Sequence, residues 1–82
     1  MNIYLISQDT NNGYDTYDSA IVTAENEDVA RLIHPDPDLE EYKYKSMYWV
    51  DDPKLVTVKL LGTLDPDMPQ KTSVLLASFN AG

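Results

Sequence analysis

The alternation of apolar and polar positions predicts two β-strands at the start of the chain. Residues 2–8 place apolar side chains on both faces of an extended chain, with Ile3 on one face and Tyr4 on the other. Apolar residues on both faces are typical of a central strand. Residues 19–24 predict a second strand, because this run is rich in β-branched side chains.

A short helix is predicted directly after the second strand. Asn26 is a favourable N-cap residue, and the two acidic residues that follow it lie where the helix dipole favours carboxylates. Val29 and Leu32 are three residues apart, so they fall on one apolar face. Pro35 ends the run, because the residue before a proline avoids helical geometry. The pattern therefore predicts a helix of about two turns.

Residues 39–50 alternate, with tyrosines at one set of positions and lysine, methionine and tryptophan side chains at the other. This alternation favours an edge strand or an extended ribbon, with the lysines discouraging further pairing at the edge. Residues 39–45 also fit a short helix, and the sequence leaves both structures open.

The last part of the chain predicts two more strands. Residues 54–61 alternate so that Val56, Val58 and Leu60 face the core. Residues 72–79 form the last predicted strand, and its simplest partner is the strand before it, as an antiparallel hairpin. If this strand instead lay beside the first one, Asn80 and Gln8 would be neighbours.

Taken in order, these elements predict a single α+β domain over residues 1–82. It consists of a mostly antiparallel sheet of four to five strands with one short helix packed on one face. A two-layer domain with an exposed sheet face or edge often dimerises, so we also expect a homodimer.

The charge balance narrows the classes of partner. The formal net charge of the 82-residue chain is −8, and residues 1–30 hold six acids and no lysine or arginine. Such a field repels phosphate backbones and anionic membranes, so we expect neither direct nucleic-acid nor membrane binding. The chain has no cysteine, which excludes disulfides and thiolate metal sites. No signal peptide or membrane-spanning run is evident, and we expect a cytoplasmic protein.

The loop between the first two predicted strands holds an unusual number of carboxylates and aromatics. Its spacing resembles a calcium-binding EF-hand loop counted from Asp9, but Gly13 occupies the fifth position and Ala20 occupies the twelfth, where that loop needs a glutamate. We therefore expect no metal and no cofactor. Carboxylates on such a loop are usually solvated, and tyrosine and tryptophan are the residues most common at interface hot spots. His34 follows the helix, where a structural role is the simpler interpretation.

These observations favour a partner-binding protein over two alternatives. One alternative is a binder of a signalling nucleotide, and the other is an enzyme assisted by a metal on the acidic loop. The predicted partner-binding residues are Asp9, Asn11, Tyr14, Asp15, Tyr17, Asp18, Tyr48 and Trp49. The residues for the nucleotide alternative are Arg31, Lys43, Lys45 and Asn80.

Three short motifs resemble a group of small phage- and prophage-encoded proteins. They are QDxNxGYDTYDSA at residues 8–20, AxxIHP at residues 30–35 and LASFNAG at residues 76–82. The resemblance implies a viral accessory protein in a bacterial cytoplasm and attaches no reaction to it. By analogy with small acidic phage proteins, it suggests a non-enzymatic inhibitor that occludes a host protein with a basic surface, such as a defence or nucleic-acid-handling protein.

Overall fold

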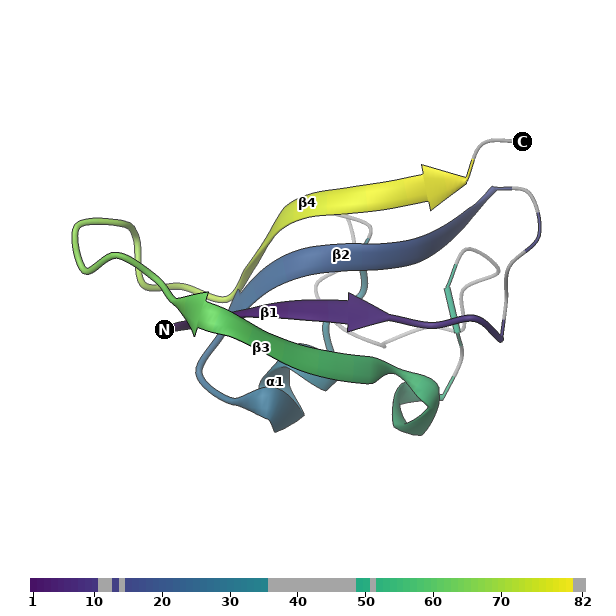
Figure 1. Ribbon diagram of the computed structural model, residues 1–82, viewed down its shortest axis with the longest axis horizontal. Coiled ribbons are helices and arrows are strands. Elements are labelled where there is room, and N and C mark those ends of the chain that lie inside the picture. The colour runs from purple at the N-terminus through teal and green to yellow at the C-terminus, as the bar shows by residue number, and fades with distance from the viewer. Residues whose placement is uncertain (11–12, 14, 36–48, 51, 81–82) are drawn as a thin grey trace.

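The computed structural model describes residues 1–10, 13, 15–35, 49–50 and 52–80 (Figure 1). Four strands form one fully antiparallel sheet in the order β3-β1-β2-β4, with one short α-helix and one 3-10 helix. This arrangement confirms the predicted α+β fold. The elements are β1 (Asn2–Ser7), β2 (Thr16–Ala24), α1 (Glu27–Arg31), η1 (Pro53–Leu55), β3 (Thr57–Thr63) and β4 (Ser73–Asn80).

The strand pairing differs from the predicted hairpin of the last two strands. β1 and β2 form a hairpin, β3 pairs with β1, and β4 pairs with β2. The last two strands therefore occupy opposite edges, and residues 64–72 connect them around one end of the sheet (Figure 1). The prediction was wrong because alternation shows which face a residue takes but not which strand lies beside it. Asn80 is in register with Thr16 on β2, so it does not lie on a strand beside β1.

Two predicted strand boundaries also moved. β2 begins at Thr16, three residues before the predicted start, and this shortens the loop after β1. β3 begins later than predicted, because residues 53–55 form η1. Asp52 caps that helix by accepting a hydrogen bond from the Lys54 amide at 3.0 Å, and Pro53 is favourable at the first helical position.

Helix α1 begins as its sequence predicts and ends sooner. The Asn26 side chain accepts a hydrogen bond from the Val29 amide at 2.9 Å, which confirms the N-cap. The helix spans five residues rather than two full turns. Arg31 at its end pairs with Glu27 at 2.9 Å and donates a hydrogen bond to the Val56 carbonyl. Arg31 therefore ties the helix to the segment before β3.

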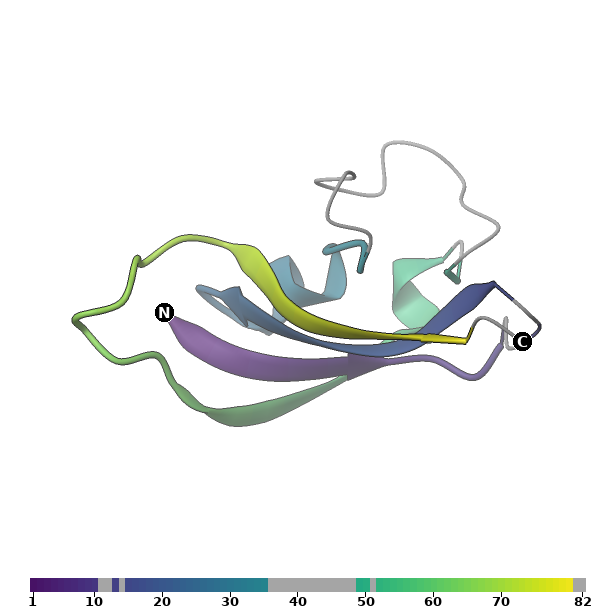
Figure 2. The same cartoon turned by 90° about the horizontal axis from the view of Figure 1, so that it is seen from above.

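The core lies on one face of the sheet, which we call the covered face. In Figure 2, α1 and η1 both lie on this side. The core combines alternate side chains of the strands with Ala30 of α1 and with Trp49. Leu60 pairs with Tyr4 and therefore belongs to this face, but it is 60% exposed because β3 is an edge strand. The prediction that Leu60 is buried was wrong. No helix in the described part of the chain is long and apolar enough to cross a bilayer.

Candidate functional site

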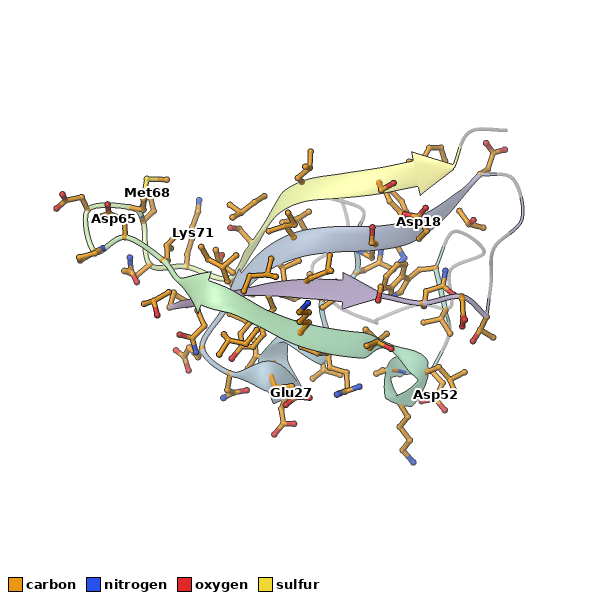
Figure 3. The ribbon with its side chains drawn as sticks, viewed as in Figure 1. Asp18, Glu27, Asp52, Asp65, Met68 and Lys71 are labelled. Carbon is orange, nitrogen blue, oxygen red and sulfur yellow. The ribbon has the colours of Figure 1, made fainter. Side chains whose placement is uncertain are left out.

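Exposed carboxylates from two separate loops lie at one end of the sheet. Because β1 and β3 are antiparallel neighbours, the end of β1 and the start of β3 meet at the same end. Asp9 and Asp15 follow β1, and Asp52 precedes β3; all three are exposed. We call these three residues the acidic end. In Figure 3, Asp52 and the labelled Asp18 of β2 lie on the same side of the molecule, far from Asp65.

Polar side chains hold the base of the loop after β1. The Gln8 amide donates to the Asp18 carbonyl at 3.1 Å, and its side-chain amide donates to the Tyr17 carbonyl at 2.8 Å. The Thr16 hydroxyl donates to the Gly13 carbonyl at 2.6 Å. Asp15 adopts a left-handed backbone with φ of 58°, which aspartate tolerates better than most residues. These bonds fix the positions from which the carboxylates project.

Tyr17 belongs partly to the core and partly to the predicted contact set. Its ring lies 4.8 Å from the ring of Phe79 and meets His34 edge-on at 6.3 Å. It is half-buried and packs against the core cluster. His34 is fully buried beside it, in agreement with a structural role. Tyr17 therefore anchors the start of β2 and leaves only part of its ring for a partner.

Trp49 requires a correction of the predicted contact set. Its side chain has no exposed surface and lies in the core cluster. A fully buried indole has no area to offer a partner, so Trp49 is a core residue. The sequence suggested a contact residue because tryptophan is common at interface hot spots, and Trp49 follows a run of tyrosines and lysines. Three further predicted contact residues lie outside the described residues, namely Asn11, Tyr14 and Tyr48, and so do Lys43 and Lys45.

The residues proposed for nucleotide binding do not form a site among the described positions. Arg31 is engaged by Glu27 and by the Val56 carbonyl. That carbonyl directly precedes β3, whereas Asn80 ends β4 on the opposite edge of the sheet. The structure therefore does not bring these two residues together.

The acidic end is an open spread of charge. Within residues 1–10, 13, 15–35, 49–50 and 52–80, the Arg31–Glu27 contact is the one salt bridge. In the same ranges, no three histidine or acidic side chains converge as metal ligands do. Asp52 is the member of the acidic end that sequence reasoning missed, because only the pairing of β3 with β1 places it there.

The face of the sheet away from α1 and η1 carries a cluster of aliphatic side chains, with serines and threonines along the same strands, and sequence reasoning did not identify these residues. We call it the open face; Figure 3 looks onto it. Residues that pair across an antiparallel sheet share a face, so the register assigns its members. Three of them are exposed by 49% or more and the other three are half-buried. The register places Ile3, Leu5, Ile21 and Leu76 on this face, and the bulge residues Leu61 and Leu75 add two exposed aliphatic side chains beside them.

Comparison of the chain with known protein families, with curated proteins and with solved structures yields no match. Function is therefore inferred from the charges and surfaces of this chain.

Proposed function

We propose that this chain is a small, phage-encoded, non-catalytic binding protein. Its acidic end covers a basic surface of a host protein in the bacterial cytoplasm and so blocks access to that surface. The resemblance of the three short motifs to phage proteins supports the phage origin. The mode of action follows from the charges of the chain and from where they lie.

One observation carries this proposal. The exposed carboxylates of Asp9, Asp15 and Asp52 project from two loops at one end of the sheet, with no salt bridge to any base of the described chain. Charges that are not neutralised within the chain are available to a partner of opposite charge. Complementary potentials raise association rates and exclude partners of the wrong sign.

The same charges explain how occlusion works. A net charge of −8 repels nucleic acids, so the chain competes for their binding surfaces without binding them. A basic surface that receives phosphates also accepts carboxylates, since both form charge-assisted hydrogen bonds with arginine and lysine. The spread of the carboxylates suits recognition of a surface better than coordination of one cation, which needs converging oxygens.

The test compares two variants with the same change in charge. In D9N/D15N, two carboxylates of the acidic end are neutralised. In E25Q/D67N, two exposed carboxylates elsewhere in the chain are neutralised. Asparagine keeps the left-handed backbone at position 15. Each tagged protein is used to capture partners from bacterial lysate, and the captured protein is then purified and titrated.

We expect D9N/D15N to weaken binding by about 5- to 30-fold, since each exposed ion pair is worth about 0.5–1 kcal/mol. We expect E25Q/D67N to bind like the wild type. Affinity should fall as salt increases, and the chain should displace nucleic acid from its partner. Equal loss in both variants, or a partner that still holds nucleic acid when saturated with the chain, would refute occlusion by the acidic end.

A further inference from the structure

We propose that the open face is a homodimer interface, in which a second copy packs its own open face across this one at about a right angle. The juxtaposition that supports it is a set of six aliphatic side chains flanked by one lysine and one aspartate on the same face. The acidic end lies outside this face. The inference therefore stands independently of the proposed function.

Two irregularities in the sheet enrich the open face in leucine. Ile3 is in register with Gly62 and Tyr4 with Leu60, so Leu61 is an extra residue in a β-bulge. Leu61 is 49% exposed and directly precedes Gly62, which the register places on the open face. In an antiparallel sheet the solvent-exposed face normally carries the polar residues of each alternating strand. This face instead gains an aliphatic side chain.

The second irregularity has the same effect at the β4 edge. Ile21 is in register with Leu76 and Val22 with Val74, so Leu75 is the extra residue there. Leu76 lies on the open face and is 66% exposed, and Leu75 beside it is 49% exposed. Clustered exposed apolar side chains of this kind mark interaction surfaces in proteins.

The charges of this face complement each other. The four strands hold two charged side chains, Asp18 on β2 and Lys59 on β3. Lys59 is in register with Leu5, which places it on the open face. Asp18 is the extra residue of a bulge next to Ser19, and the Ser19 hydroxyl donates to its carboxylate at 3.2 Å. Because Ser19 lies on the open face, the carboxylate of Asp18 lies there too.

This pair of charges identifies a second copy as the occupant. In a two-fold dimer the same patch meets itself, so a residue that contacts another is contacted by it in return. Lys59 of each copy then meets Asp18 of the other, giving two ion pairs around the aliphatic centre. The open face carries balanced charges in a chain of net charge −8, so it is where two copies meet with least repulsion.

The positions of the two charges also set the geometry of the dimer. Ile21 and Lys59 both pair with Leu5, so they lie at the same level of the sheet, two strands apart. Asp18 lies three residues from Ile21 along β2. Lys59 and Asp18 are therefore separated by roughly 10 Å both across and along the strands. A two-fold axis between the two facing sheets must place Lys59 of one copy over Asp18 of the other. Such an axis runs diagonally across the strands and passes near Ile21. The strands of the two copies then cross at about 90°, which is one of the two common classes of sheet packing.

Sedimentation and light scattering of the pure protein test the interface. We expect a mass about twice the 9.3 kDa of one chain, with K59E and D18K each raising the dimer dissociation constant about tenfold or more through like charges. The double variant D18K/K59E restores opposite charges and should return to the wild-type dimer. K54E makes the same charge change outside the open face and should leave the dimer intact.

The apolar centre is tested separately. L76K should give a monomer, whereas L55K, at a leucine of η1 that is 50% exposed, should remain dimeric. Circular dichroism confirms that each variant is folded. A wild type that is monomeric at about 100 µM would overturn the proposal and leave the face to another occupant. A dimer that survives L76K, or one that D18K/K59E fails to restore, would overturn it by placing the interface elsewhere.

Discussion

The two faces of this sheet are built from the same strands and have opposite surroundings. On the covered face, Tyr4, Ile6 and Val22 are buried under α1 and the segment at Trp49. On the open face, Leu5 and Ile21 come from the same two central strands and remain half-buried. Apolar side chains on both faces normally indicate a sheet covered on both sides. Here one cover comes from the chain itself, and the aliphatic side chains of the other face are the basis of the proposed homodimer.

Truncating a side chain at the centre of the covered face should cause the largest loss of stability. Trp49 is fully buried, so W49A should lower the free energy of unfolding by about 3–5 kcal/mol. A domain of this size has only about 4–12 kcal/mol to lose, so the variant should be close to unfolded at 37 °C. Urea unfolding followed by far-ultraviolet circular dichroism measures the loss.

W49F serves as the control, because it keeps an aromatic ring in the site and should recover part of the lost free energy. A loss below about 1 kcal/mol for W49A would place the indole at the surface, since a cavity in a packed core costs more than that. Trp49 would then return to the set of partner-contact residues.

A matched pair of variants compares the two faces directly. Ile6 and Leu5 are neighbours on β1, the first fully buried and the second half-buried on the open face. I6A should cost about 2–4 kcal/mol, and L5A should cost less than about 1.5 kcal/mol at low protein concentration. Urea midpoints at about 1 µM give both values. Equal losses would mean that the open face is already covered in the monomer.

Raising the protein concentration to about 100 µM makes the comparison of L5A with I6A more discriminating. A dimer built on the open face stabilises the folded state by mass action, so the loss caused by L5A should grow with concentration. The loss caused by I6A should change much less. A constant difference between the two would argue against association through the open face.

Much of the fold was predictable because local signals agreed with it. The N-cap at Asn26 satisfies a helix amide, and that requirement is local in the sequence. Strand pairing is not local. The β1–β2 hairpin has two edges of similar character, and alternation within β3 or β4 cannot show which edge each strand joins. The bulges at Leu61 and Leu75 could not be predicted from the sequence either, since a bulge is defined by the pairing with the neighbouring strand.

The site was only partly predictable for the same reason. The sequence identified Asp9 and Asp15 because one loop holds them both. It missed Asp52, which joins them only through the pairing of β3 with β1. It placed Trp49 at the surface, because tryptophan is common at interface hot spots. Burial depends on which element lies over a side chain, and neighbours in the sequence do not determine that.

The smallest predicted effect concerns the cover itself. Helix α1 has five residues, too few to be stable without its contacts to the sheet and its cap. N26A removes the acceptor that meets the Val29 amide at 2.9 Å and should lower the free energy of unfolding by about 1 kcal/mol. N26D keeps an acceptor in place and should be within about 0.3 kcal/mol of the wild type. Thermal and urea unfolding of the three proteins measure the difference.

If N26D loses as much as N26A, the amide–carboxamide bond is not what holds the start of the helix. The cover would then depend on the packing of Ala30 and on the Arg31 contact with the Val56 carbonyl.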